Sequence, residues 1–290
     1  MTTLARRNLS GYAFVGPFLF LYLVILIWPL LFGITISFHR ADLFGARVWV
    51  GVRNYVALLA DPVFGQAVLN TFKLALLIVP PLAALTLALA LALNRTTRSA
   101  AIFRGIFFSS SVLSVTIVTL IWRFVLTPDA GLIAKILVPM GVAPPPFLSD
   151  PGLTIPALAI TTIWWSVGLP MMLFLAGLQQ IPGDIYEAAA LDGAGRWTTF
   201  RRITLPSIRR TLVLVLMLQT AAQLQIFGQA QLLTGGGPSG ASRPIVLFIY
   251  EVAFGRWELG YASAAAEMLF GLVLILTLVQ YWAVSRKDPA

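Results

Sequence analysis

The residues that could do chemistry in this 290-residue chain are few, and their types exclude most metal and covalent chemistry. The chain holds no cysteine, one histidine (His39) and 11 acidic residues, which are scattered along it. Thiolate-bound metals, disulfides and clusters of histidine ligands are therefore excluded. A membrane-embedded enzyme acting on lipids would need a metal or acid–base cluster at one membrane face. This class of function is accordingly disfavoured.

Charged and small residues are concentrated in one segment, 179–210, which reads QQIPGDIYEAAALDGAGRWTTFRRITLPSIRR. Asp184 with Glu187 three residues later has the spacing of a capping box, and this predicts the start of a short helix. Asp192 and Gly193 should end that helix, because glycine permits the left-handed conformation found at helix ends.

A second short helix is expected from Arg196 onward. It should stop before Pro206, because the residue that precedes a proline avoids the helical region. Small side chains on the first helix would let another protein approach closely. The two short helices, joined by a sharp bend, therefore predict a docking element for a partner protein.

The composition indicates that most of the chain outside this segment lies in a membrane. Apolar residues make up 59 % of the chain and charged residues 11 %, against about 45–50 % and about 25 % in an ordinary globular protein. Six stretches are long and apolar enough to span a bilayer as helices. The expected fold is therefore an all-α polytopic membrane protein with one transmembrane domain over 1–290. The expected spans are approximately 12–38, 71–93, 106–126, 153–178, 211–233 and 262–284.

The basic residues predict the orientation of these spans. The formal net charge is +9, and on so apolar a chain this excess orients helices rather than binding nucleic acid. One set of loops carries 12 basic residues and the opposite set six. The positive-inside rule therefore predicts that both termini lie in the cytoplasm. The predicted cytoplasmic set is Arg6, Arg7, Arg95, Arg98, Arg104, Arg196, Arg201, Arg202, Arg209, Arg210, Arg286 and Lys287, and the opposite set is Arg40, Arg47, Arg53, Lys135, Arg243 and Arg256.

The 179–210 segment resembles the EAA motif of the membrane subunits of binding-protein-dependent ATP-binding-cassette (ABC) importers. That motif is Glu-Ala-Ala, three residues, Gly, nine residues, Ile, any residue, Leu-Pro. Every fixed position is matched, and the motif falls between the fourth and fifth predicted spans. The matching residues are Glu187, Ala188, Ala189, Gly193, Ile203, Leu205 and Pro206.

The resemblance extends over nearly the whole chain and is strongest to the carbohydrate-uptake branch, with its MalF-like and UgpA-like subunits. The segments that carry it are NYVALLADPVFGQAVLNTF, WRFVLTPDAGLI, FLAGLQQIP, LLTGGGP and YEVAF with GYASA. The chain has neither the extra N-terminal spans nor the large insertion of the maltose protein. It resembles the minimal six-span form, the type I importer fold.

The resemblance implies a mechanical role for the motif. Glu187 would pair with a basic or hydrogen-bonding group on an ATPase subunit, and Ala188 and Ala189 would form a close-packing face. Gly193 would supply the bend, and the Leu205-Pro206 pair would link the loop to the fifth span. The chain has no GxxxxGK[ST] run, so ATP and Mg²⁺ would bind the partner ATPases, with no cofactor on this non-catalytic chain.

The resemblance also implies a set of partners and a location. The expected partners are a second, MalG-like or UgpE-like permease subunit, two ATPase subunits, an extracytoplasmic sugar-binding protein and membrane lipid, with no nucleic acid. The expected location is the cytoplasmic (inner) membrane of a bacterium or archaeon, crossed several times.

Polar and aromatic residues inside the spans are candidates for the substrate pathway, because polar groups are costly in lipid. Gln219 and Gln223 share one helix face, and amide groups can bind sugar hydroxyls or bond to neighbouring helices. Indole rings can stack on a sugar or fill packing space. Substrate contact and a structural role remain open for every member. The full set is Trp164, Trp165, Gln219, Gln223, Phe227 and Glu267.

Two alternatives to a neutral di- or oligosaccharide importer remain open. Glycerol phosphate is the second candidate substrate, but an anion would favour an arginine or lysine at mid-depth, and no predicted span has one there. A self-contained channel or secondary transporter is disfavoured, because we detect no inverted hydropathy repeat. It would also leave the EAA pattern without a role.

Overall fold

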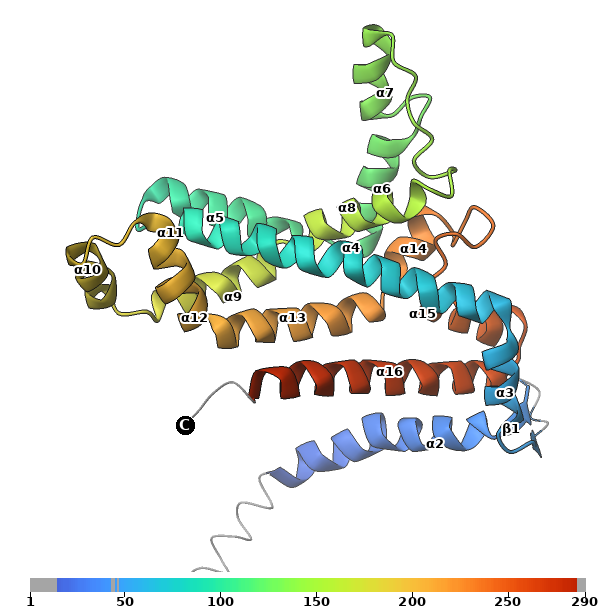
Figure 1. Ribbon diagram of the computed structural model, residues 1–290. Coiled ribbons are helices and arrows are strands. Elements are labelled where there is room, and N and C mark those ends of the chain that lie inside the picture. Colours follow the sequence, from blue (N-terminus) through green and yellow to red (C-terminus); the bar gives the residue numbers. More distant parts are fainter. Residues whose placement is uncertain (1–14, 43–44, 46, 286–290) are drawn as a thin grey trace, which may run out of the picture. The chain divides into compact units, whose positions relative to one another are not determined.

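The computed structural model describes residues 15–42, 45 and 47–285, with side chains described as far as Trp282. The predicted cytoplasmic residues Arg6, Arg7, Arg286 and Lys287, and positions 12–14 of the first predicted span, lie outside these residues. The described chain is mainly helical, with one small sheet (Figure 1). It divides into two units, which we describe separately. Unit 1 is Met1–Asp61 with Ile249–Phe270, and unit 2 is Pro62–Phe248 with Gly271–Ala290.

Unit 1 begins with a long apolar helix, Val15–Ser37, which contains one π-helical turn. A short antiparallel hairpin follows, in which His39 pairs with Trp49. The side chains of the first helix are exposed rather than buried in the chain, as expected of a helix that faces lipid. The elements of unit 1 are η1 (Leu23–Ile27), α2 (Trp28–Ser37), β1 (His39–Ala41), β2 (Arg47–Trp49), α3 (Arg53–Ala60), η4 (Glu251–Gly255) and the first part of α16 (Leu259–Ser285).

Close contacts hold α16 against the rest of unit 1. A Cβ atom on Gly260 would overlap the carbonyl oxygen of His39, so the hairpin and α16 meet where no side chain intervenes. One residue further along α16, the Tyr261 hydroxyl donates a hydrogen bond of 3.0 Å to Asp61 Oδ2. The start of α16 is therefore fixed to both the hairpin and the end of α3.

Unit 2 is built around the long helix α4 (Pro62–Leu93), which packs against α8, α9 and α13. Its buried side chains Leu74, Ile78 and Leu82 form one apolar core with Leu158 of α8. The remaining elements are α5 (Arg98–Ser110), α6 (Val115–Leu126), α7 (Leu132–Leu137), η2 (Val138–Met140), α8 (Thr154–Ser166), α9 (Gly168–Gln179), α10 (Gly183–Leu191), α11 (Arg196–Thr199), η3 (Phe200–Thr204), α12 (Leu205–Ser207), α13 (Arg209–Leu224), α14 (Gly228–Leu233) and α15 (Ile245–Tyr250), which crosses into unit 1.

A polar contact from α4 holds the glycine-rich segment after α14. The Asn70 side-chain amide donates to the carbonyls of Gly240 and Arg243, at 2.9 and 3.1 Å. The neighbouring Thr71 hydroxyl accepts a hydrogen bond of 2.9 Å from the backbone N–H of Ile245. Both α4 side chains are buried, so they satisfy backbone groups that a helix or sheet would otherwise pair.

The apolar helices support some of the predicted spans individually. Three helices are long and apolar enough to cross a bilayer, namely Val15–Ser37, Pro62–Leu93 and Leu259–Trp282. Two bent pairs, α5 with α6 and α8 with α9, bring the number in the described chain to as many as five. The predicted fifth span, 211–233, forms α13 and α14 with a break between them. Six spans therefore stay a prediction.

The predicted spans 106–126 and 153–178 are interrupted rather than continuous. Helices α5 and α6 meet at 95°, and Ser114 caps the second of them by accepting from the Ile117 N–H at 3.3 Å. Helices α8 and α9 meet at 50°. Pro170 causes the second break. It lacks an N–H, and its ring would clash with the helical carbonyl of Ser166, which is four residues earlier and is the last residue of α8.

Candidate functional site

The 179–210 segment forms helices at one end of unit 2, where α9 ends and α13 begins (Figure 1). The first of them, α10, begins at Gly183 after Pro182, and no side chain caps its start. Asp184 lies inside the first turn, where its charge is favourable near the helix N-terminus. The predicted capping box of Asp184 and Glu187 is therefore wrong, because the helix starts before Asp184.

Gly193 ends α10 as predicted. Its φ angle is +72°, in the left-handed region. The Gly193 N–H donates to the Ala190 carbonyl at 3.1 Å, and the Ala194 N–H donates to the Ala189 carbonyl at 2.9 Å. These two bonds form a Schellman motif, which satisfies two of the last carbonyls of the helix and turns the chain sharply.

The second helical stretch continues beyond its predicted end. It runs through α11, the π-helical η3 and α12, and Pro206 lies within α12. The prediction that it stops before Pro206 is wrong. In η3 the Leu205 N–H bonds to the carbonyl of Phe200, five residues earlier, instead of the carbonyl four residues earlier as in an α-helix. This wider π-helical turn shifts the carbonyl groups that precede Pro206, so the helix can continue through the proline.

Contacts inside the chain fix which face of α10 is free. The Tyr186 hydroxyl is hydrogen-bonded to Thr204 Oγ1 at 3.1 Å, which links α10 to η3. Ala189 lies on the inner side of α10 and is 8 % exposed. Glu187 and Ala188 are exposed. Of the two alanines predicted to form a close-packing face, only Ala188 is therefore available to another protein.

Two large apolar residues also lie open on these helices, and the motif does not include them. Leu191 is 90 % exposed and Trp197 is 70 % exposed. Leu191 is four residues after Glu187, so the two share the outer face of α10. We call Glu187, Ala188, Leu191 and Trp197 the coupling face, after the role that the EAA resemblance implies for this loop. The sequence analysis did not single out Leu191 and Trp197. Their apolar side chains in an otherwise charged loop are the signal that could have found them.

The last motif residues lead into the following helix. Ile203 and Leu205 are half-buried and Pro206 is exposed. The backbone N–H of Ile208 bonds to the Thr204 carbonyl at 3.1 Å, which carries the hydrogen-bonded path from η3 to the start of α13. A rigid movement of the coupling face would therefore reach α13 through a nearly continuous helical segment.

The glutamine candidates for the substrate pathway are buried within unit 2. Gln219 is 8 % exposed and Gln223 is 4 % exposed, and both lie on α13. The Gln223 amide donates to Gln219 Oε1 at 3.5 Å. Both glutamine side chains are thus buried within this chain and bonded to each other. This geometry fits a role in helix packing, which is one of the two roles that the sequence left open.

The two tryptophan candidates differ in their surroundings. Trp164 is 39 % exposed and meets Trp122 of α6 edge to face, with ring centroids 6.0 Å apart. The indole N–H of Trp165 donates to the Leu113 carbonyl at 3.0 Å, between α5 and α6. Part of the Trp164 ring is thus exposed on the surface of the chain, whereas Trp165 joins two helix breaks. The sequence analysis did not single out Trp122.

The last two candidates lie in different units. Phe227, between α13 and α14, is half-buried and packs against the apolar core of unit 2. Glu267 of α16 is in unit 1, where its carboxylate lies beside Gly33 of α2, so that a Cβ on that glycine would be 3.3 Å from Glu267 Oε1.

The hydrogen bond of Trp165 makes a testable prediction. We expect Trp165→Phe to lower the free energy of unfolding by about 1–2 kcal/mol, because it leaves the Leu113 carbonyl without its partner. Titration of the purified chain from a mild detergent into dodecyl sulfate would measure this. Trp164→Phe is the control and should change the midpoint little, because the Trp164 indole N–H has no hydrogen-bond partner among the residues that the structure describes. Equal midpoints for the two variants would contradict the structural role of Trp165.

Comparison with known proteins agrees with this architecture. Residues 84–288 match the family described as "Binding-protein-dependent transport system inner membrane component". The chain is 34 % identical over 282 residues to the trehalose/maltose transport system permease protein MalF of Thermococcus litoralis, covering 97 % of this chain and 95 % of that one. It is 30 % identical to the sn-glycerol-3-phosphate transport system permease protein UgpA of Brucella abortus, covering 97 % and 96 %.

A solved structure shares the fold. It is the crystal structure of a bacterial alginate ABC transporter in complex with an alginate pentasaccharide-bound periplasmic protein. One of its chains matches with a TM-score of 0.84 at 25 % identity, over 95 % of this chain and 93 % of that chain. With the matched family model and the EAA pattern on α10 to α12, these likenesses show that the chain belongs to the binding-protein-dependent transport system inner membrane component family, the permeases of ABC importers.

Proposed function

We propose that this chain is the permease subunit of an ATP-driven sugar importer in the cytoplasmic membrane. It forms half of the translocation pathway, with six spans and both termini in the cytoplasm. The observation that carries the proposal is the coupling face, an exposed set of one acid, one small residue and two large apolar residues. Exposed aromatic and aliphatic groups around a charge are typical of protein–protein hot spots.

The partners follow from this role. The coupling face docks on an ATPase subunit, which binds ATP and Mg²⁺, while this chain itself is non-catalytic. A second homologous permease subunit supplies the other half of the pathway and the other docking face, for a second ATPase. An extracytoplasmic binding protein delivers the sugar, and the solved alginate transporter in complex with its periplasmic protein supports this arrangement.

A neutral di- or oligosaccharide is the favoured substrate. The MalF relative, a trehalose/maltose permease, supports a disaccharide. The exposed ring of Trp164 offers a surface on which a sugar ring can stack. The UgpA relative supports glycerol phosphate as the second candidate. A phosphate would need a basic group along the pathway, and the partner permease could provide it.

Transport by the assembled system tests this function. The chain would be co-expressed with the neighbouring transporter genes, purified as a complex and reconstituted in liposomes with the binding protein. We expect uptake of a labelled disaccharide such as maltose or trehalose that requires ATP on the ATPase side. The isolated chain should hydrolyse no ATP. Robust hydrolysis by the isolated chain would refute the proposal, and uptake of glycerol phosphate alone would replace the sugar with the second candidate.

Neutralising Glu187 should weaken assembly. Glu187 is exposed, so Glu187→Gln should leave the helices folded, while the loss of one partner of a desolvated charge pair costs about 2–5 kcal/mol at an interface. Because about 1.4 kcal/mol corresponds to a factor of ten in affinity, we expect co-purification of the ATPase to fall by about tenfold or more. Asp192→Asn is the matched control. It also removes one negative charge, but Asp192 follows the last residue of α10 and is not part of the coupling face. An unchanged yield of ATPase with Glu187→Gln would count against the docking role of this residue.

A further inference from the structure

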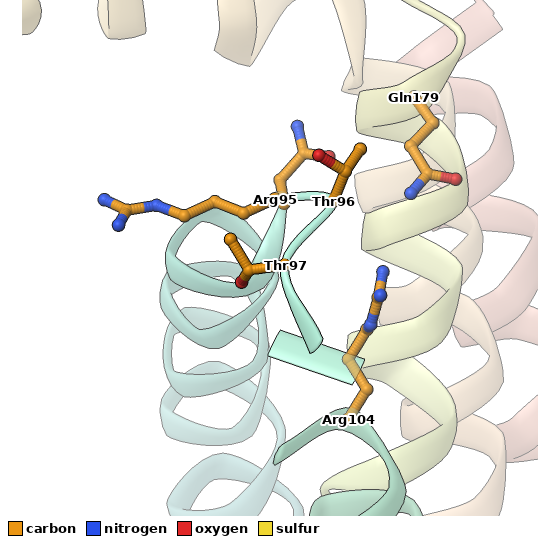
Figure 2. A pocket seen from close by; sticks show the side chains of 6 residues that line it. Arg95, Thr96, Thr97, Arg104 and Gln179 are labelled. Carbon is orange, nitrogen blue, oxygen red and sulfur yellow. The ribbon is translucent and has the colours of Figure 1, made fainter. Parts of the chain in front are cut away.

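A surface cavity lined by polar residues lies in unit 2 at the junction of three helix ends. It has a volume of ≈ 600 Å³ and lies where α4 ends, α5 begins and α9 ends. In Figure 2 the side chains of Arg104 and Gln179 point toward the same opening, with Thr96 beside it, while Arg95 extends away from Arg104. The lining residues are Asn94, Arg95, Thr96, Thr97, Arg104 and Gln179, none of them acidic.

The positive charge of this cavity is not compensated within the described part of the chain. Residues 94–105 hold three arginines and no acid. Arg104 is half-buried, and across the described residues neither its guanidinium nor that of Arg95 has a hydrogen-bond or ion-pair partner. A guanidinium presents a planar fork of donors that fits a phosphate. The Arg104 guanidinium beside hydroxyl and amide side chains, with the charge of Arg95 at the rim, therefore makes a site for an anion.

The start of α5 adds to this preference. Thr97 caps the helix by accepting from the Ala100 N–H at 3.3 Å. The positive end of the helix dipole thus lies at the cavity wall, where it favours an anion in addition to the two arginines.

The surroundings indicate that the anion comes from lipid. The cavity follows directly on Leu93, the last residue of a helix long and apolar enough to span a bilayer. On α5, next to the cavity, Ile102, Phe103 and Ile106 are 63 %, 50 % and 57 % exposed. Exposed apolar side chains within one turn of Arg104 place the cavity at the depth where hydrocarbon meets headgroups. Basic pockets between membrane helices at this depth bind anionic lipid headgroups.

We propose that this cavity binds the phosphodiester headgroup of an anionic phospholipid. Arg104 holds the phosphate, Arg95 adds positive charge at the rim, and the threonine hydroxyls with Asn94 and Gln179 bind the remaining headgroup oxygens. The site needs only the membrane location of the chain and does not depend on coupling to an ATPase. If the lipid site is disproved, the proposed transport function still stands. If the transport function is disproved, the lipid site still stands.

Binding of short-chain lipids to the full-length chain in a neutral detergent tests the site. Native mass spectrometry would follow titrations with dihexanoyl-phosphatidylglycerol, dihexanoyl-phosphatidylcholine and inorganic phosphate. We expect saturable binding of the phosphatidylglycerol, with the phosphatidylcholine at least about tenfold weaker. Arg104→Gln should weaken phosphatidylglycerol binding by about tenfold or more, because it removes a charge-assisted pair. Arg98→Gln, in the same segment but outside the cavity lining, should change it by less than about threefold.

Three results would overturn the proposal. Phosphatidylglycerol binding that survives Arg104→Gln would show that the lipid lies elsewhere. Competition by inorganic phosphate at concentrations equal to the lipid would make this a site for a free anion. Equal binding of the phosphatidylcholine and the phosphatidylglycerol would show that the cavity does not select an anionic headgroup. Arg95→Gln provides the same comparison should Arg104→Gln fail to fold.

Discussion

Gly193→Val is expected to uncouple the transporter while leaving the chain in the membrane. The left-handed φ of +72° at this position is strained for a β-branched residue. Space is not the obstacle, because an added Cβ would meet no atom within 4 Å. The variant should therefore lose the Schellman bonds and rotate α10 away from α11. We expect binding-protein-stimulated ATP hydrolysis by the reconstituted complex to fall at least about tenfold, the equivalent of 1–2 kcal/mol.

Gly193→Asn separates conformation from side-chain volume. Asparagine adopts the left-handed region several times more readily than valine, and it also finds open space here. We expect this variant to keep most of the stimulated hydrolysis. Equal activity of the valine and asparagine variants would mean that the bend after α10 does not set the position of the coupling face.

Gly168→Ala is expected to be the most destabilising of the small changes. A Cβ at Gly168 would lie 2.6 Å from Ser111 Oγ and 2.8 Å from Phe108 Cα. The Gly168 N–H also donates to Ser111 Oγ, which in turn donates to the Trp165 carbonyl, at 3.1 and 3.0 Å. The methyl group would push apart the two helix breaks that these bonds join, and backbone cannot move aside as a flexible side chain can.

We expect Gly168→Ala to lower the free energy of unfolding by at least about 2 kcal/mol, within the range for overpacking a tight contact. Unfolding of the purified chain in mixed micelles would measure it. Gly105→Ala on α5 is the matched control, because its Cβ would meet no atom within 4 Å. Alanine in a helix should stabilise that site by about 0.4–1 kcal/mol. Similar losses for both variants would contradict the close approach at Gly168.

The features of the coupling loop that depend on local chemistry could be predicted from sequence. The left-handed turn at Gly193 follows from the freedom of glycine alone, and the exposure of Glu187 follows from its charge. The burial of Ala189 could not be predicted, because Tyr186 and Thr204 bring α10 against η3 through residues 18 positions apart in the chain. The EAA pattern fixes which residues are present, whereas tertiary contact decides which of them face outward.

The breaks in the predicted spans were missed for two reasons. Hydropathy sums over a window, so it reports an apolar stretch whether or not the backbone bends within it. Pro170 was a visible signal for the break after Ser166. The break before α6 needed the hydrogen bonds between Ser111, Trp165 and Gly168, which join segments more than 50 residues apart. The sequence left open whether Gln219 and Gln223 face the pathway or a neighbouring helix for a related reason, because helix periodicity assigns a shared face but not what lies beside it.

Cross-linking from the coupling face tests the central claim most directly. The chain has no cysteine, so Ala188→Cys introduces a single thiol on the exposed side of α10. Ala143→Cys, exposed in the proline-rich segment between α7 and α8 that is predicted to lie on the opposite side of the membrane, is the control. In membranes that contain the whole complex, a thiol-reactive photo-cross-linker on Ala188→Cys should capture the ATPase subunit, and the same reagent on Ala143→Cys should not. Capture of the ATPase from position 143 and not from 188 would contradict the account.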